Sequence, residues 1–117
     1  MNSLEISKST AHIMVETIEY IPNSVVQKMI MNRSTGNICI MSFDSGQGIK
    51  ERILSYDTLA QIIDGIAEIT IEGNSQMLES GECMIIPAYL PNAFKANQRF
   101  KMILTSFKPP IPRKTSI

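Results

Sequence analysis

The stretch from Gly46 to Gly65, "GQGIKERILSYDTLAQIIDG", has the spacing of a metal site without the residues that bind metal. Where imidazole or carboxylate ligands are expected, the chain has Arg52, Leu54 and Thr58. Arginine offers no lone pair, leucine has no donor atom, and a neutral hydroxyl binds transition metals poorly without imidazole or carboxylate partners. We therefore expect a pocket that holds no metal centre.

Length and charge narrow the classes of function. The chain has 117 residues, which is enough for one domain with its own core, since such a domain buries roughly two-thirds of its unfolded surface. Eleven basic and eleven acidic residues give a formal net charge of zero. No long-range field then steers the protein to nucleic acid or an anionic membrane, and we expect neither partner. Low self-repulsion favours a homodimer.

The N-terminus and the cysteines point to an intracellular protein. "MNSLEISKSTAHIMVE" lacks the apolar run of a signal peptide, and no stretch approaches the roughly 20 apolar residues of a membrane span, so we expect a cytoplasmic protein. Cys39 and Cys83 lie in apolar, strand-like segments and are expected to be small buried side chains. His12, the only histidine, lies in an N-terminal segment whose structure the sequence does not define, and no catalytic Cys–His pair is predicted.

Turn signals recur every 8–12 residues between short apolar segments, which is typical of an all-β sandwich or barrel. We expect the barrel to cover residues 25–108 and to begin with a hairpin, "VVQKMIM" and "ICIMSF" joined by "NRSTGN". Residues 1–24 form an N-terminal arm, either a helix or an edge strand. Residues 109–117 form a proline-rich tail, because proline donates no hydrogen bond to a central strand.

Two motifs in this barrel resemble those of the cupin family. The first family motif runs G-x5-H-x-H-x3,4-E-x6-G, and the Gly46 to Gly65 stretch keeps its glycines and spacing. The second runs G-x5-P-x-G-x2-H-x3-N. Here Gly81 and Pro87 match, Asn92 stands at the histidine, Tyr89 replaces the inner glycine and Ala96 the final asparagine.

The resemblance covers about residues 25–107 and implies a cupin-type double-stranded β-helix, or jelly-roll barrel, with a short N-terminal arm. The family's four metal-ligand positions fall on Arg52, Leu54, Thr58 and Asn92. No imidazole or carboxylate stands at any of them, so we expect neither a metal nor another cofactor.

Strand alternation extends these four positions into a pocket. If residues 52 and 54 point inward, then 58, 60 and 62 do so on the next strand, and 92, 94 and 96 on a later one. We therefore predict a small-ligand site. We expect Ala60 to line this pocket, together with the predicted ligand-binding residues Arg52, Leu54, Thr58, Ile62, Asn92 and Phe94.

Arg52 is the most informative of these residues, because a guanidinium facing a barrel interior needs an anion. That anion is a ligand, or a carboxylate of Glu51, Asp57 or Asp44. Alternatively, the side chain extends along the rim to solvent. Asn92 has its own alternative role, as a turn residue that binds its own backbone.

Three functions remain open. The first is a non-catalytic, metal-free protein that binds a small organic ligand, with an anion as one candidate. The second is a metal-independent isomerase or epimerase acting on small sugars or carboxylates, which needs a base in the pocket. The third is a structural dimer whose pocket is filled by side chains. No catalytic residue is assigned, because the predicted lining contains no acid or base.

Overall fold

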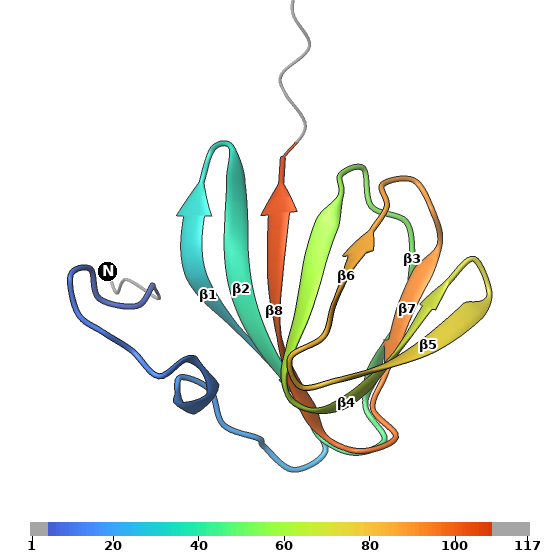
Figure 1. Ribbon diagram of the computed structural model, residues 1–117, viewed down its shortest axis with the longest axis horizontal. Helices are drawn as coiled ribbons and strands as arrows, with labels where there is room; N and C mark the ends of the chain where they lie inside the picture. The colour runs from blue at the N-terminus through green and yellow to red at the C-terminus, as the bar shows by residue number, and fades with distance from the viewer. Residues whose placement is uncertain (1–4, 109–117) are drawn as a thin grey trace, which may run out of the picture.

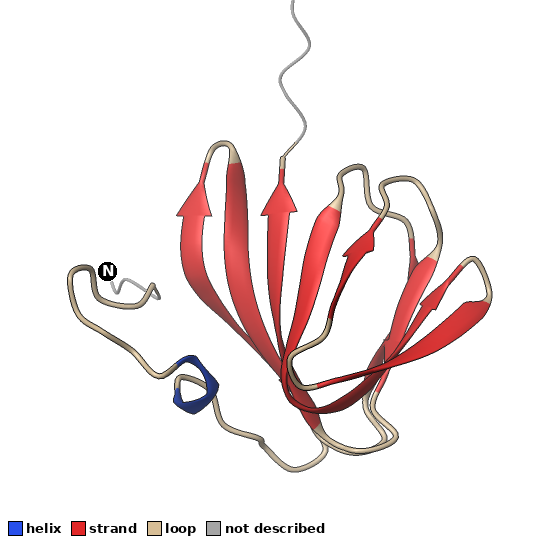
Figure 2. Cartoon of the chain, viewed as in Figure 1, coloured by secondary structure: helices blue, strands red, loops and turns tan. Residues whose placement is uncertain are grey.

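The computed structural model describes residues 5–108, and their regular structure is almost entirely β-strand (Figure 2). One turn of 3-10 helix, η1 (Met14–Glu16), precedes the strands. The strands are β1 (Val25–Arg33), β2 (Gly36–Phe43), β3 (Gly48–Arg52), β4 (Thr58–Ile71), β5 (Asn74–Glu79), β6 (Cys83–Ile86), β7 (Asn92–Lys95) and β8 (Phe100–Phe107). The proline-rich tail predicted at 109–117 lies outside the described residues. Within them, no helix is long and apolar enough to cross a membrane.

The strands form one antiparallel sheet that curls into an open barrel (Figure 1). The order is β1-β2-β8-β4-β7-β3, and β5 and β6 both pair with β4. The hairpin predicted at the start of the barrel is confirmed, with Val25 opposite Phe43 and Arg33 opposite Gly36. Residues 58–65 of β4 pair with β8, and residues 66–71 pair with β5. The predicted all-β jelly-roll fold is confirmed, and β4 joins its two halves.

Gly65 lies where β4 passes from one half of the barrel to the other. Its φ is +76°, and an added Cβ would overlap the Arg99 carbonyl oxygen. Only glycine adopts this backbone conformation at no steric cost. The last glycine of the first motif is therefore needed for the close pairing of β4 with the strand that starts at Phe100.

The core lies on the concave face of the sheet and contains three stacked or tilted phenylalanines. The Phe43 and Phe100 rings stack with centroids 4.4 Å apart, and the Phe94 ring lies 6.4 Å from Phe43. Thr58, Ala60 and Ile62 alternate inward along β4, and Asn92, Phe94 and Ala96 are likewise buried. This aromatic group fills part of the barrel interior and so limits the space left for a ligand.

The N-terminal arm packs against the opposite, outer face of the sheet (Figure 1). Ile18 is buried against Ile30 of β1 and Ile40 of β2. The Tyr20 hydroxyl donates a 2.6 Å hydrogen bond to Asp64, and Lys101 Nζ donates one of 2.7 Å to the Val15 carbonyl. Of the two structures predicted for the arm, a helix or an edge strand, the described part contains one short turn of 3-10 helix, η1, and no strand.

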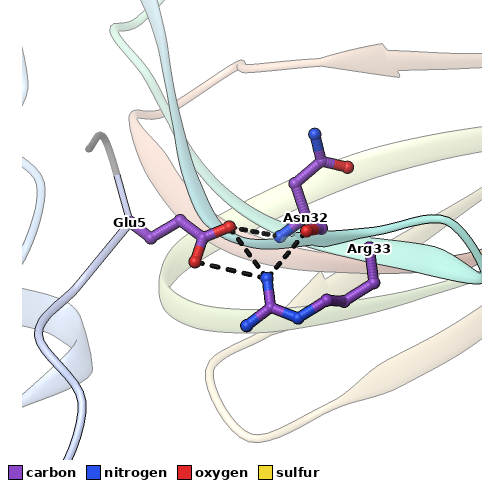
Figure 3. Close-up of polar contacts among 3 residues, drawn as sticks. All are labelled: Glu5, Asn32 and Arg33. Atoms are coloured by element: carbon purple, nitrogen blue, oxygen red, sulfur yellow. Dashed lines mark hydrogen bonds and ion pairs between the residues drawn. The ribbon is translucent and has the colours of Figure 1, made fainter. Parts of the chain in front are cut away.

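The start of the arm is attached to β1 by a carboxylate (Figure 3). Glu5 accepts a 2.8 Å hydrogen bond from the backbone N–H of Asn32 and forms an ion pair of 3.1 Å with Arg33. These groups are solvent-exposed, and an exposed ion pair contributes about 0–1 kcal/mol. The apolar contacts therefore hold the arm more strongly than this ion pair does.

The expectation that both cysteines are buried is wrong for one of them. Cys39 is buried, whereas Cys83 is exposed at the start of β6. The segment "CMII" is apolar on both faces, so its sequence does not indicate which face turns inward. In the structure Ile86 faces the core, and Cys83 and Ile85 alternate with the partly or fully buried positions and face outward.

Candidate functional site

A cavity of about 170 Å³ lies inside the barrel, at the end where β4 begins and β8 finishes. The hairpin strands β1 and β2 line one side, with Gln27, Met29, Asn37, Cys39 and Met41. The other lining residues lie on or near β3, β4 and β8 and are Ile49, Arg52, Leu54, Tyr56, Thr58, Leu104 and Ser106. Arg52, Leu54 and Thr58, three of the residues predicted from the motifs, therefore line one cavity.

Arg52 is the only charged residue that lines the cavity among the described residues. Its Nε is buried and has no hydrogen-bond partner, and no carboxylate in residues 5–108 lies within ion-pair distance of it. Two carboxylates considered as partners are engaged elsewhere. Asp57 accepts a hydrogen bond from Ala88 N, and Asp44 accepts one from Asn23 N. Arg52 thus lines the cavity without an ion-pair partner from the described chain.

Asn92 lies beside Arg52 rather than on the cavity wall. The two residues are paired across β3 and β7, and Asn92 Nδ2 donates to the Arg52 carbonyl at 3.2 Å and to the Leu90 carbonyl at 3.3 Å. Asn92 is 1% exposed, and its Oδ1 has no partner. The bond to Leu90, two residues earlier, is the local backbone contact considered for a turn residue, whereas the bond to Arg52 connects two strands.

The hydroxyl predicted at the third motif position is already engaged. Thr58 is buried, and its Oγ1 lies 3.1 Å from Ser106 Oγ across the β4–β8 pair. Because a hydroxyl both donates and accepts, the pair satisfies one hydrogen bond of each group and retains some capacity toward the cavity. Leu54 adds apolar surface to the same wall.

Ile62 and Phe94, also predicted to bind ligand, lie deeper in the barrel. Both are buried in the core cluster, at 1% and 3% exposure, and neither lines the cavity. The alternation places them on the concave face, but Phe43 and Phe100 fill the space next to them. The alternation of side chains along a strand predicts which face of the sheet a residue is on. The packing of neighbouring side chains decides whether that residue reaches a cavity.

The hairpin contributes a wall that the motifs did not indicate. Asn37, Cys39 and Met41 share one face of β2, and Met29 is paired with Cys39 across the hairpin. Burial raises the pKa of the Cys39 thiol, while the charge of Arg52 and a hydrogen bond with Gln27 act in the opposite direction. The raised pKa keeps this thiol protonated at neutral pH. Side-chain alternation along "NICIM" places Asn37, Cys39 and Met41 on one face and so could have indicated this wall. Neither cupin motif includes this segment.

The residues at the metal-ligand positions do not fit a metal ion. Arg52 supplies a positive charge, Leu54 supplies no donor atom, and the Thr58 hydroxyl is bonded to Ser106. Nowhere in residues 5–108 do three or more His, Cys, Asp or Glu side chains form a group that could hold a metal. The donor chemistry at this site suits an anion better than a cation.

Comparison of the structure with solved structures supports the fold. A conserved protein of unknown function from Streptococcus pyogenes has a TM-score of 0.86 and 25% identity, over 92% of this chain and 94% of that chain. A cupin superfamily protein from Desulfitobacterium hafniense has a TM-score of 0.84 and 24% identity, over 90% and 96% of the two chains. An RmlC-like cupin from Shewanella frigidimarina has a TM-score of 0.72 and 15% identity, over 86% and 91%.

The two sequence comparisons, unlike the structural one, found no similar protein. No protein-family model matches the chain, and the search of curated proteins gave no match. The structural likenesses therefore confirm the fold predicted from the two motifs, and the function rests on the residues of the cavity.

Proposed function

The chain has the cupin fold, and on that premise we propose that it is a non-catalytic protein that binds a small organic anion inside its barrel. The observation that carries this proposal is the environment of Arg52, a permanently charged side chain that lines the cavity and whose Nε is buried without a hydrogen-bond partner. A buried donor without an acceptor costs about 1–3 kcal/mol, and more when the group is charged. An anionic ligand in the cavity would bring the opposite charge to this guanidinium.

The second candidate, a metal-independent isomerase or epimerase, lacks a base in the site. Among the described residues, the cavity lining contains no His, Asp, Glu or Lys. Cys39 lines the cavity, but burial raises the pKa of its thiol and so disfavours the thiolate. General acid–base catalysis needs a group that titrates near the working pH within reach of the substrate. Binding without catalysis fits this lining better.

The third candidate, a structural dimer with a filled pocket, is less well supported than binding. Phe94 and the other aromatic rings occupy the deeper part of the barrel, but a cavity of about 170 Å³ remains beside Arg52. A side chain placed only for packing would be expected to leave no buried donor unsatisfied.

We propose a homodimer as the working form and the cytoplasm as its location. β1 is at the end of the strand order, so one of its edges is open to pairing, and Met31 on β1 is exposed. The segment from Ile18 to Met31 is the one we expect to cross to the partner. Sedimentation at about 50 μM, above a dimer Kd of about 10⁻⁶ M, should give a dimer, and a monomer would contradict this.

A metal-free barrel is part of the same proposal. Protein purified without chelator should contain no stoichiometric iron, manganese, nickel or zinc by elemental analysis. A metal bound between Arg52, Leu54, Thr58 and Asn92 would refute it.

The binding proposal is tested by a thermal-shift screen of small carboxylates, phosphates and sugars on the full chain. Arg52→Met removes the charge, and Arg33→Met is the matched control, because Arg33 lies on the surface of β1 in an exposed ion pair. We expect at least one anion to raise the melting temperature of the wild type and of Arg33→Met, with a loss of roughly tenfold to a hundredfold in affinity in Arg52→Met. An anion effect that is equal in all three proteins would contradict the proposal.

A further inference from the structure

We infer that the cavity selects a small hydroxylated monocarboxylate, whose carboxylate pairs with Arg52 and whose hydroxyls bind the neutral polar side chains of the lining. The inference rests on the proposed function, since it names the class of anion that Arg52 binds. Its support comes from the polar groups of the lining, from their arrangement across three strands, from the single charge and from the volume of the cavity.

The lining combines one charge with several neutral polar groups. It presents more polar than apolar surface to the cavity. Besides Arg52, the side chains with amide or hydroxyl groups are those of Gln27, Asn37, Tyr56, Thr58 and Ser106. Amides and hydroxyls both donate and accept hydrogen bonds, as the hydroxyls of a ligand do. A ligand with an apolar body would cover these groups without bonding to them, and a polar group buried without a partner costs free energy.

Three of these groups form a polar row across neighbouring strands. Asn37 of β2 lies opposite Ser106 of β8, and Ser106 lies opposite Thr58 of β4. The row lies at the end of the barrel where β4 begins and β8 finishes, and the next pair inward, Cys39 and Leu104, is mainly apolar. Neighbouring strands are about 4.8 Å apart, so a ligand of three or four carbon atoms reaches more than one member of the row.

Several of the polar groups have hydrogen-bonding capacity that the described chain does not use. Within residues 5–108, neither the Asn37 amide nor the Tyr56 hydroxyl makes a side-chain hydrogen bond. The Thr58 and Ser106 hydroxyls lie 3.1 Å apart and bond to each other, and each keeps capacity for a further bond. A ligand with hydroxyls on adjacent carbon atoms can use these groups together.

The charge of the lining matches one carboxylate. Arg52 is the only ionised side chain on the lining from the described residues, so a monoanion leaves no charge uncompensated. A dianion would bring a second negative charge with no cation to meet it, which is unfavourable. Although burial raises the pKa of the Cys39 thiol, the charge of Arg52 acts to lower it. The guanidinium therefore lies close to β2, the strand that also carries Asn37.

The volume limits the ligand to a short chain. The cavity measures about 170 Å³. A protein cavity of about 150 Å³ is known to hold benzene, a molecule of six carbon atoms. The space therefore suits an acid of about three or four carbon atoms together with its hydroxyls.

The test uses four probes on the full chain, by isothermal titration calorimetry at constant ionic strength. Threonate carries a carboxylate and three hydroxyls, butyrate has the same carbon chain without hydroxyls, and threitol has the hydroxyls without the charge. Inorganic phosphate is the fourth probe, and threonate and threitol are each used in both enantiomeric forms. We expect one form of threonate to bind roughly tenfold or more tightly than the other three compounds, because only threonate uses both the charge and the polar row.

Two variants separate the charge from the row. Arg52→Met should weaken threonate by roughly tenfold or more and leave threitol unchanged. Asn37→Leu should weaken threonate roughly threefold to tenfold and leave butyrate unchanged. Asn32→Leu is its matched control, because Asn32 lies opposite Asn37 on β1, is exposed and does not line the cavity. If Asn37→Leu does not fold, Tyr56→Phe replaces it, with the exposed Tyr89 changed to Phe as control. Arg52→Gln likewise replaces Arg52→Met.

The outcomes separate this inference from the function on which it rests. Butyrate or phosphate that binds as tightly as threonate, and depends on Arg52, would overturn the ligand class and leave anion binding intact. Equal effects of Asn37→Leu and Asn32→Leu on threonate would do the same. Threitol that binds as tightly as threonate, with no effect of Arg52→Met, would overturn both. If no probe binds, the inference is refuted, and the proposed function is refuted with it if the wider screen also finds no anion.

Discussion

Arg52, the last residue of β3, lies opposite Asn92, the first residue of β7, and each carries a buried polar atom without a hydrogen-bond partner. The two unsatisfied atoms complement each other in chemistry, since Nε donates and Oδ1 accepts. They stand at two of the four positions where the cupin motifs place metal ligands. The chain thus keeps polar groups at these positions, although their chemistry differs from that of a metal site.

Gly65 provides a test of how the two halves of the barrel are joined. In Gly65→Ala, the added Cβ overlaps the Arg99 carbonyl in a backbone conformation that disfavours alanine, and we expect the free energy of unfolding to fall by about 2–5 kcal/mol. Gly73→Ala is the matched control, because its φ of +80° is similar but no atom lies within 4 Å of the added Cβ. It should lose only about 1–2 kcal/mol. Equal losses in urea denaturation would refute the role of close packing.

Tyr89 replaces a glycine of the second motif and provides a test of backbone strain at that position. It stands where the motif has glycine, and the backbone keeps the glycine-type conformation, with a φ of +65°. Its side chain is 70% exposed and therefore contributes little packing. We expect Tyr89→Gly to raise the free energy of unfolding by about 0.5–1 kcal/mol, because relief of backbone strain exceeds the added entropy of the unfolded chain. Tyr89→Ala, which keeps the strain, should not become more stable; a gain there would contradict this explanation.

The Tyr20–Asp64 hydrogen bond should make the attachment of the arm depend on pH. Burial, with the hydrogen bond and charge of Asp64, raises the pKa of Tyr20 well above that of a free tyrosine, which is about 10. Below pH 10 the stabilisation is complete. As pH rises above 10, the unfolded chain loses the proton first, and the stabilisation falls until the pKa of the folded state is reached.

Tyr20→Phe removes this effect. We expect the variant to be less stable than the wild type by about 1–2 kcal/mol at pH 8, from loss of a hydrogen bond to a carboxylate. In urea denaturation at pH 8, 9.5 and 10.5, the difference between the two proteins should become smaller at the highest pH. A difference that stays constant or grows would contradict the assignment.

The sequence predicts the fold better than it predicts the cavity. Turn spacing and the motif glycines depend on backbone geometry, and Gly65 shows that geometry directly. Alternation also places Thr58 and Asn92 on the inner face. Whether Ile62 and Phe94 reach open space depends on how Phe43 and Phe100 pack, and those contacts join segments distant in sequence.

The motifs did not predict two further features of the structure. The hairpin wall, with Cys39 and Met41, enters the site because β2 pairs with β8, a long-range register that local patterns do not specify. The orientation of Cys83 was also not predictable from local sequence. Its strand is apolar on both faces, so only the pairing of β6 with β4 decides which face turns inward.

The melting temperature of Arg52→Met, with and without an anion that stabilises the wild type in the thermal-shift screen, tests the central claim most directly. If Arg52 is present to bind an anion, its buried and unpartnered Nε is a cost in the empty protein. The variant should then melt at the same temperature as the wild type or a few degrees higher, for a gain of up to about 1 kcal/mol. The anion should raise the melting temperature of the wild type and leave that of the variant unchanged. A variant that melts lower than the wild type without ligand, and is stabilised as much as the wild type by the anion, would show that Arg52 supports the fold and does not bind an anion.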